Sequence, residues 1–375
     1  MRGLSFLIAA TLFAVVLSGG RDTALATTSG VPDSMAALGD SITQATNFDQ
    51  FHFGSNPTYS WATGTQSVVQ SVYTRILAGN PNISAKNFNY SVNGAKMADL
   101  NGQAVNVNGT PGGVELVMIE MGGNDVCTSM ESTMTPVDTY RTQFQTAMNT
   151  LTTGFPNRRI LVLSVPDVYQ LWVVLHTNPN AVNFWNGVQI CQSLLANPTS
   201  MDQGDVDRRA RVRQRNIDFN TQLSEVCALY PKCTSDNNGV FNAGFTAADV
   251  SDLDYFHPSL QGQTNLAAGA WAGYDMDGDG WPSGSETTIG TSALDNCADT
   301  PAPNDEADDK WPADLNDDRF SDGTDITIVA GSFGKAVPSQ APARHNLAPV
   351  NGPDGFVDGT DITVLAGFFG HACGP

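Results

Sequence analysis

Two patterns of apolar residues alternate along the first three quarters of the chain. Short and nearly continuous apolar runs are typical of buried strands; they stand at Ser34–Leu38, Asn87–Ser91, Glu115–Glu120 and Arg159–Val165. Longer stretches with apolar residues three or four positions apart are typical of helices; they stand at Gln66–Leu77, Val137–Leu151, Val182–Leu195, Val206–Leu229 and Gln261–Ala272. We therefore expect strands that alternate with helices.

Continuous apolar strands separated by helices indicate a parallel sheet that is covered on both faces. The predicted fold class is therefore α/β. After Gly273 the long apolar runs stop and Asp, Gly, Pro and Asn predominate, so we place a domain boundary there. Because sites in such sheets form at the carboxyl ends of the strands, the residues just after each run are the candidates for chemistry.

The first 26 residues have the pattern of an export signal. Arg2 supplies a positive start, an apolar stretch follows from Leu4 to Leu17, and Ala24-Leu25-Ala26 is a small-x-small cleavage site. The apolar stretch is too short for a comfortable membrane span. We predict a signal peptide at 1–26, a secreted mature chain and no transmembrane anchor in it; a retained anchor is the alternative.

Charge and cysteine content narrow the class of protein further. The 18 basic and 38 acidic residues give a formal charge of −20, which argues against a nucleic-acid partner. The six cysteines fit an exported chain, where thiols oxidise. Cys227 and Cys233 close a short loop; pairing by domain suggests Cys127 with Cys191 and Cys297 with Cys373, although the sequence does not fix the connectivity.

The run that ends at Leu38 leads into Gly39-Asp40-Ser41. A serine at a strand end becomes a nucleophile when a base takes its proton and a carboxylate orients that base. Among the histidines of the α/β part, His257 stands out because Asp254 precedes it by three residues, a spacing that lets the carboxylate turn back to the imidazole. An isolated Asp-x-x-His is also common in ordinary surface loops.

Two other strand ends offer donors for an oxyanion. Asn124, in the segment "GGND" at 122–125, can aim its amide at developing negative charge, and Gly94 can present its backbone N–H. Each feature alone is common at structural turns. Their order at successive strand ends, Ser, Gly, Asn and then Asp/His, favours nucleophilic catalysis.

These four segments, "MAALGDSIT" at 35–43, Gly94, "GGND" and "DYFHP" at 254–258, resemble the sequence blocks of the SGNH (GDSL-type) hydrolases. The resemblance spans about 34–273 and implies a flavodoxin-like three-layer α/β/α sandwich and ester hydrolysis through an acyl-serine. It implies that Ser41 is the nucleophile, His257 the base and Asp254 its orienting acid. The implied oxyanion hole consists of the Ser41 and Gly94 N–H groups and the Asn124 amide. "NPTYSWATGT" at 56–65 resembles the phospholipase B-like branch.

Two further stretches allow a functional and a structural interpretation. The segment "YQLWVVLH" at 169–176 is unusually apolar and lines either an acyl pocket or the packed core. Arg208, Arg211 and Arg215 share one helical face, which either meets anionic head groups or is a solvated surface.

The last quarter of the chain is strongly acidic and internally repeated. From Tyr274 onward there are 18 Asp/Glu and 4 Lys/Arg, so this part carries −14 of the −20 charges. The segments "FSDGTDITIVAGSFG" at 320–334 and "FVDGTDITVLAGFFG" at 356–370 agree at eleven of fifteen positions. A duplicated loop–helix unit follows from this repeat.

The spacing of the tail carboxylates predicts calcium loops. "DMDGDGWPSGSE" at 275–286 matches the calcium-loop template, with Asp275, Asp277, Asp279 and Glu286 at loop positions one, three, five and twelve. "DLNDDRFSDGTD" at 314–325 places Asp314, Asn316, Asp318 and Asp325 in the same way, although Arg319 replaces the usual glycine. We read 274–313 as an acidic calcium-binding linker.

The region 314–375 resembles a dockerin type I module, which implies a cohesin-like partner; a calcium-stiffened stalk is the alternative. In the second copy Asp354 and Asp361 are the matching carboxylates, and either Asn346 or Asn351 substitutes at the first position if the loop carries an insertion. Loop 314–325, in the first copy of the repeat, is therefore expected to bind Ca²⁺ better than the loop of the second copy.

We predict an exported serine ester hydrolase of 27–273 that acts on lipid or small acyl esters, with no cofactor for catalysis and structural Ca²⁺ in its tail. A carbohydrate acetyl esterase of a polysaccharide-degrading assembly is the alternative within enzymes. A non-catalytic surface-binding protein is the alternative from another class.

Overall fold

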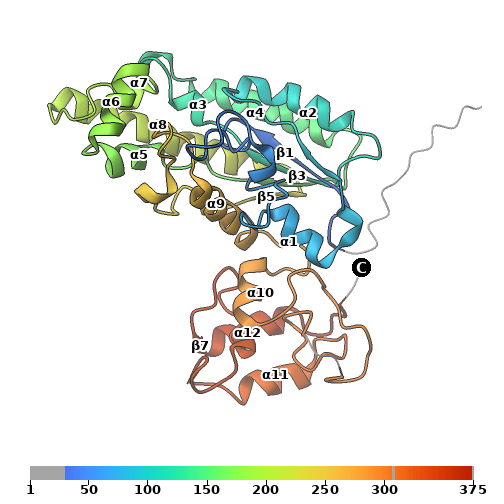
Figure 1. Ribbon diagram of the computed structural model, residues 1–375. Coiled ribbons are helices and arrows are strands. Elements are labelled where there is room, and N and C mark those ends of the chain that lie inside the picture. The colour runs from blue at the N-terminus through green and yellow to red at the C-terminus, as the bar shows by residue number, and fades with distance from the viewer. Residues whose placement is uncertain (1–29, 306–308, 374–375) are drawn as a thin grey trace, which may run out of the picture.

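A five-stranded parallel sheet forms the centre of the larger domain in the computed structural model, which describes residues 30–305 and 309–373 (Figure 1). Its strands are β1 (Met35–Gly39), β2 (Asn87–Asn89), β3 (Leu116–Glu120), β4 (Arg159–Val162) and β5 (Cys233–Ser235). They lie in the order β2-β1-β3-β4-β5, which is the flavodoxin-like order. This confirms the predicted α/β class and the three-layer sandwich.

Helices cover both faces of the sheet because successive strand residues point to opposite faces and are apolar on both. Ala36 and Leu38 of β1 face a core shared with α2 (Leu100–Asn108), α4 (Val137–Thr152) and α8 (Gln203–Cys227). Met35 and Ala37 face the other core, which α1 (Val72–Gly79) and α9 (Leu260–Ala272) complete.

The remaining elements of this domain are four short helices between β3 and β5 in the sequence, and single 3₁₀ turns. The helices α3 (Gly123–Val126), α5 (Val168–Leu175), α6 (Pro179–Val188) and α7 (Gln192–Leu195) lie on the side of the domain that carries the carboxyl ends of β3 and β4. Single 3₁₀ turns occupy Pro57–Tyr59, Pro81–Ile83, Met97–Asp99, Glu131–Thr133 and Ala247–Asp249.

Several elements differ from the sequence-based expectation. The helix expected from Gln66 begins at Val72, and the helix expected over 182–195 is broken between α6 and α7, where Gln189 and Cys191 have positive φ values of 52° and 47°. The pattern did not reveal α2, α5 or β5. Strand β5 has few apolar residues and is recognised only by its pairing with β4.

Three disulfides join the six cysteines in the pairs predicted from the sequence. They link Cys127 to Cys191, Cys227 to Cys233, and Cys297 to Cys373. The first joins the end of α3 to the start of α7, and the third closes the C-terminal region. These bonds are consistent with an oxidising compartment. The predicted signal peptide at 1–26 lies outside the described residues.

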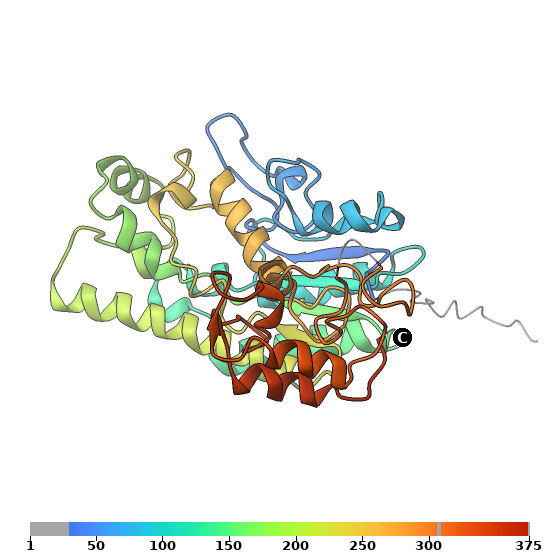
Figure 2. The same cartoon turned by 90° about the horizontal axis from the view of Figure 1, so that it is seen from below.

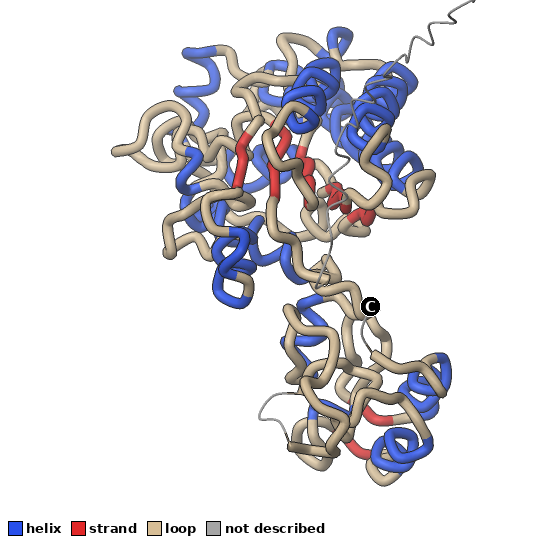
Figure 3. The backbone as a smooth tube through the Cα atoms, turned by 90° about the vertical axis from the view of Figure 1, so that its right-hand side faces the viewer, coloured by secondary structure: helices blue, strands red, loops and turns tan. Residues whose placement is uncertain are grey.

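The C-terminal region folds as a second, smaller lobe below the sheet (Figures 1 and 3). It contains α10 (Ser283–Ile289), α11 (Gly323–Ala330), the antiparallel pair β6 (Lys335–Ala336) and β7 (Phe356–Val357), a 3₁₀ turn at Ala343–His345, and α12 (Gly359–Gly367). Trp281 and Trp311 pack in one core with Val329 and Leu365, so the segment expected as a linker shares a core with the repeat.

The two lobes meet near the amino ends of the strands. Arg159, the first residue of β4, donates hydrogen bonds to the carbonyl oxygens of Asp275 (2.7 Å) and Met276 (2.8 Å) and to the Tyr274 hydroxyl (2.7 Å). The tail therefore lies opposite the edge where sites form. Within the described ranges, no helix combines the length and the apolar character needed to cross a bilayer.

Candidate active site

The chain turns sharply after β1, and this turn places Ser41 at the carboxyl edge of the sheet. Gly39 has a φ of 156°, and a side chain there would collide with the Glu120 carbonyl oxygen of the neighbouring strand. A glycine is therefore required, because only glycine fits both the conformation and the space. Asp40 then accepts a 2.9 Å hydrogen bond from the Ile42 N–H, which holds the turn that presents Ser41.

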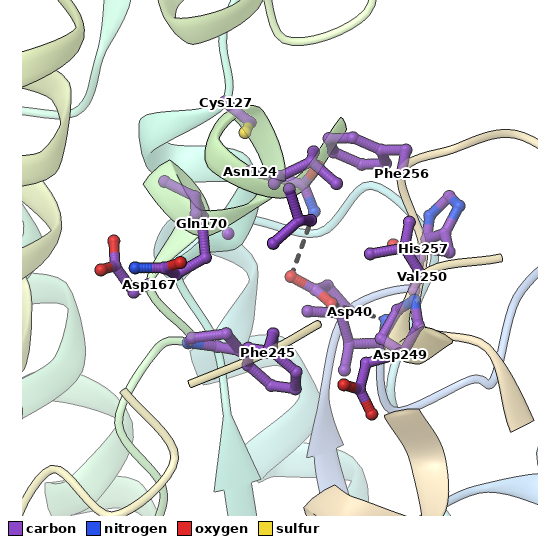
Figure 4. Close-up of a pocket in the computed structure, with 18 residues that line it drawn as sticks. Asp40, Asn124, Cys127, Asp167, Gln170, Phe245, Asp249, Val250, Phe256 and His257 are labelled. Atoms are coloured by element: carbon purple, nitrogen blue, oxygen red, sulfur yellow. Dashed lines mark hydrogen bonds between the residues drawn. The ribbon is translucent and has the colours of Figure 1, made fainter. Parts of the chain in front are cut away.

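Ser41 lines a cavity at this edge of the sheet (Figure 4). Asn124 and His257 line the same cavity, so three of the predicted site residues meet there although they are far apart in sequence. The remaining wall is largely apolar and comes from α5 and from the loop before α9: Val168, Leu171, Val174, Phe245, Val250 and Phe256. In Figure 4 Asp167 and Gln170 lie on one side of this cavity, and His257 and Val250 on the other.

Asp254 holds the imidazole of His257 in a fixed orientation. Its Oδ2 lies 2.6 Å from His257 Nδ1, and its Oδ1 accepts hydrogen bonds of 3.0 Å from the backbone N–H groups of Phe256 and His257. Burial would raise the pKa of Asp254, but the bonds from His257 outweigh it and lower the pKa below its usual value. The carboxylate therefore stays ionised and leaves Nε2 of His257 available as a base.

Asn47 is a fourth member of this group that the sequence analysis missed. Its side-chain amide donates a 2.9 Å hydrogen bond to Asp254 Oδ2, the same oxygen that contacts the imidazole. Asn47 lies 207 positions from Asp254, and only the tertiary fold reveals the contact. Asp49 and His52 also form an Asp-x-x-His pair, 2.8 Å apart, but His52 does not line the cavity. The spacing alone therefore does not distinguish the two histidines.

Of the predicted oxyanion donors Asn124 and Gly94, only Asn124 lines the cavity. Asn124 lies at the start of α3, and its amide donates to Asp40 Oδ2 (3.2 Å) and to the Ala95 carbonyl (3.0 Å). Gly94 has a φ of 75° and lies in the turn after β2, in a neighbouring hollow rather than among the residues that line the cavity. To face a substrate oxyanion, the Asn124 amide has to give up one of its two partners, of which Asp40 is the more distant.

Two buried carboxyl groups, Asp40 in the turn and Glu120 at the end of β3, were given no role by the sequence analysis. Burial raises the pKa of Asp40 to about 6, although the Ile42 N–H and the nearby His257 partly oppose this. Burial, followed by repulsion from Asp40, raises the pKa of Glu120 well above its usual value. Neither carboxyl oxygen of Glu120 has a hydrogen-bond partner in the described part of the chain. Its burial without such a partner therefore favours the protonated form of Glu120.

The structure also decides between the two interpretations of α5 and of the arginine face. On α5, Leu171 and Val174 line the cavity while Trp172 and Leu175 are buried in the core, so the helix serves both purposes. Each of the three arginines has a partner within the protein. Arg208 pairs with Asp205, Arg211 pairs with Glu131, and Arg215 donates to the Thr135 carbonyl.

The fold is an α/β sandwich with flavodoxin-like strand order, and the cavity lies at the carboxyl edge of its sheet. Residues 35–270 match the model of the GDSL-like lipase/acylhydrolase family, and the chain belongs to this family of carboxylic ester hydrolases. No curated protein matches the chain.

Three solved structures of esterases are similar to the chain at low identity. A variant of an acetyl xylan esterase from Geobacillus stearothermophilus is 15% identical over 66% of this chain and 96% of its own, with a TM-score of 0.41. A lipase/acylhydrolase from Enterococcus faecalis is 16% identical over 63% and 92%, with a TM-score of 0.37. A psychrotrophic esterase from Pseudoalteromonas sp. is 13% identical over 63% and 93%, also with a TM-score of 0.37.

In the tail, the carboxylates of loop 275–286 converge. Asp275, Asp277 and Asp279 each bring an oxygen within 4.8 Å of the others. One oxygen each of Asp277, Asp279 and Glu286 is buried without a hydrogen-bond partner among the described residues. Burial and mutual repulsion raise the pKa of Asp277 to about 7, of Asp279 to about 8 and of Glu286 to about 10. Buried oxygens that repel one another are a donor set that fits a hard cation such as Ca²⁺.

The carboxylates of loop 314–325 also accept hydrogen bonds from backbone N–H groups, as Asp275 does from Gly278 and Gly280 in loop 275–286. Asp314 accepts from Asp318 and Arg319, and Asp325 accepts from Leu315, Asn316 and Asp322. Within the described ranges, the only three acidic, His or Cys residues gathered closely enough to hold a metal ion are those of loop 275–286.

The second copy carries the insertion that the sequence allowed for. Asp361 accepts from the N–H groups of Leu347 and Ala348, as Asp325 does from Leu315 and Asn316 in the first copy, so the second loop is four residues longer. Asn346 takes the place of Asp314. With its amide rotated so that both ends find partners, its oxygen accepts from the Gly355 N–H and its nitrogen donates to the Ala348 and Phe356 carbonyls. Asp354 accepts from the Phe356 N–H.

Proposed function

We propose that the chain is an exported serine esterase that cleaves acyl esters through an acyl-Ser41 intermediate. The observation that carries this proposal is the cavity in which Ser41 and the Asp254-oriented His257 meet beside a largely apolar wall. Ser41 Oγ attacks the ester carbonyl carbon while His257 Nε2 takes its proton. His257 then returns this proton to the departing alcohol, and water, activated by the same imidazole, releases the acid.

The oxyanion that forms during attack needs donors in this proposal. The Ser41 and Gly94 backbone N–H groups and the Asn124 amide are the candidates carried by the family resemblance. Asn124 is supported by its position in the cavity wall, since it needs only to release Asp40. Asn124→Ala is expected to lower kcat by about 10²-fold with little change in KM, as for other side-chain oxyanion donors.

The apolar wall favours acyl chains longer than acetyl as substrates. Leu171, Val174, Phe245 and Phe256 offer the contacts that an extended acyl chain needs, whereas an acetyl group would leave most of the wall uncovered. We therefore favour lipid-type esters over acetylated carbohydrate. The phospholipase B-like branch suggested by 56–65 is one form of this proposal.

Hydrolysis of p-nitrophenyl esters from acetate to palmitate tests both parts of the proposal. We expect activity that Ser41→Ala abolishes at unchanged melting temperature, with a maximum at medium or long chains. A matched control is Ser60→Ala, which alters a buried serine outside the cavity. A maximum at acetate, together with release of acetate from acetylated xylan, would favour the carbohydrate esterase. Inactivity of the folded protein on every ester would leave the surface-binding alternative.

We propose that loop 275–286 holds one Ca²⁺ ion as a structural element of the tail. Asp275, Asp277, Asp279 and Glu286 would supply its carboxylate ligands, and the ion would neutralise their repulsion. Terbium bound in this loop would lie beside Trp281, the seventh loop residue, so excitation of tryptophan reports binding directly. Asp277→Ala is expected to abolish this signal, whereas Asp318→Ala, the same change in loop 314–325, is expected to leave it. Equal binding in both variants would contradict the assignment.

Export and attachment complete the proposal. The export pattern at 1–26 and the three disulfides support secretion, and mass spectrometry of the secreted chain should find an N-terminus near Thr27. The duplicated helices α11 and α12 pack against each other, which supports a dockerin-like attachment to a cohesin-like partner. Binding of the whole chain to an immobilised cohesin domain, lost on chelation of calcium, is the expected outcome; no binding would favour a stalk.

A further inference from the structure

A loop beside the active site carries two phenylalanines that nothing covers within the described ranges. We call this loop, residues 47–54, the Phe loop. Phe51 and Phe53 are 89% and 84% exposed, the highest values among the large apolar residues that the structure describes. In Figure 2 the blue N-terminal part of the chain includes a loop that stands out from the body. Exposed aromatic residues of this kind cost solubility, so they are expected to serve a contact.

The Phe loop is a folded element with a closed neck. Asn47 and Gly54 exchange two hydrogen bonds: the Asn47 N–H donates to the Gly54 carbonyl (3.0 Å), and the Gly54 N–H donates to Asn47 Oδ1 (2.7 Å). Inside the loop Phe48 is buried and stacks on His52 at 4.5 Å between ring centroids. One aromatic residue thus supports the loop from within, while Phe51 and Phe53 point away from it.

The neck of the Phe loop is bonded to both sides of the proposed active site. On one side, Asn47 donates to the Asp254 carboxylate, and its carbonyl accepts from the Ser251 hydroxyl. On the other side, Asn93, which precedes the proposed oxyanion residue Gly94, bonds to Thr46 (2.7 Å) and Ser55 (2.9 Å) at the two ends of the loop. The exposed phenylalanines are therefore carried on a loop whose neck is bonded to the Asp254 carboxylate that orients His257.

Charge indicates what kind of surface these residues meet. From Val31 to Thr74 the chain contains no Lys or Arg, and in the Phe loop Asp49 is paired with His52 at 2.8 Å. A surface that binds anionic head groups needs basic residues, and the chain as a whole carries a charge of −20. Neutral or zwitterionic lipid is therefore the complementary surface.

We propose that the Phe loop binds the surface of neutral or zwitterionic lipid that presents the ester to Ser41. Phe51 and Phe53 enter the interface, and the bonded neck holds the cavity mouth next to that surface. This inference rests on the proposed esterase function and extends it, because it assigns the physical state of the substrate: an aggregated lipid rather than a dissolved ester.

Vesicle binding and hydrolysis test the proposal in separate arms. The protein with Ser41→Ala, which cannot turn over substrate, is mixed with phosphatidylcholine vesicles and separated by flotation. We expect binding that falls by about tenfold or more when Phe51→Ser and Phe53→Ser are added, because two aromatic side chains lose their apolar contact. Phe333→Ser with Phe369→Ser, which alters two exposed phenylalanines of the tail, is the matched control and should leave binding unchanged.

The active forms are then compared on two presentations of an ester. The Phe51→Ser/Phe53→Ser variant is expected to hydrolyse dissolved p-nitrophenyl butyrate at the original rate, while its rate on an ester embedded in phosphatidylcholine vesicles falls by about tenfold. Equal vesicle binding with and without the two phenylalanines would overturn the proposal. Absence of vesicle binding in both forms would also overturn it. If the two substitutions then changed a dimer into a monomer, the Phe loop would bind a second copy of the chain. If they abolished binding to insoluble xylan, it would bind polysaccharide. Failure of the unaltered chain on the dissolved ester would instead contradict the esterase function itself.

Discussion

The orientation of His257 by Asp254 leads to the sharpest prediction, for the substitution Asp254→Asn. The two backbone N–H groups that donate to Oδ1 require an oxygen at this position. The amide nitrogen of the variant must then take the place of Oδ2, where it faces His257 Nδ1 and the donating amide of Asn47. The imidazole can accept this new N–H only by moving its own proton to Nε2. The nitrogen that should take the Ser41 proton is then already protonated.

The magnitude follows from this tautomer change. An amide in place of a triad carboxylate lowers kcat by about 10⁴-fold in a serine protease that binds its histidine through the same kind of bond. At about 1.4 kcal/mol for each tenfold change, this corresponds to about 5.5 kcal/mol of lost transition-state stabilisation. Here the clash with Asn47 adds a further penalty, so we expect kcat/KM to fall by at least about 10⁴-fold.

The assay is hydrolysis of a dissolved p-nitrophenyl ester between pH 5 and pH 9, together with a melting curve for each variant. The control is Asp252→Asn, the same chemical change two residues away, where the carboxylate is exposed and bonds only to the Gln50 side chain among the described residues. We expect the control to retain full activity. If Asp254→Asn retained more than about a tenth of kcat/KM in a folded protein, the assigned role of Asp254 would be refuted.

Three further predictions concern the cavity, a buried acid and the tail. Val174→Trp fills part of the apolar wall, so kcat/KM for an octanoate ester should fall by about tenfold while that for acetate changes little; a parallel loss on both would contradict an acyl site there. Burial raises the pKa of Asp40 from 3.8 to about 6, so the folded state binds this proton more tightly than the unfolded state, and stability is lost as the pH rises from about 4 to 6. Asp40→Asn should therefore gain about 3 kcal/mol relative to the unaltered chain between pH 4 and pH 7 in urea unfolding, and a constant difference would argue against the raised pKa. Removal of the disulfide between Cys297 and Cys373, which spans 76 positions, should destabilise the tail by about 4 kcal/mol and leave esterase activity intact; lost activity would show that the lobes are coupled.

Most of the sheet was predictable because its strands carry their burial in their own residues. Leu116–Glu120 and Arg159–Val162 are apolar on both faces, and that pattern has no stable place outside a covered sheet. By contrast, β5 (Cys233–Ser235) and α2 (Leu100–Asn108) are polar enough to pass for loops. They form because a neighbouring strand or helix offers hydrogen bonds or a packing surface.

The sequence by itself determined the residues whose role depends on local geometry. The strand-to-turn passage at Gly39–Ser41, the Asp-x-x-His spacing of Asp254 and His257, and the carboxylates of loop 275–286 each act within a short segment, so their order in the chain contains the information. The same locality explains why the spacing also matched Asp49 and His52, which form a pair but do not line the cavity.

Tertiary structure alone decided which of these groups meet and what surrounds them. Asn47 reaches Asp254 across 207 positions, Glu120 is buried beneath Asp40 through strand pairing, and Asn346 replaces Asp314 only because the second loop is longer. Contacts of this kind depend on how distant segments pack, and packing is a property of the whole folded chain rather than of any window of its sequence.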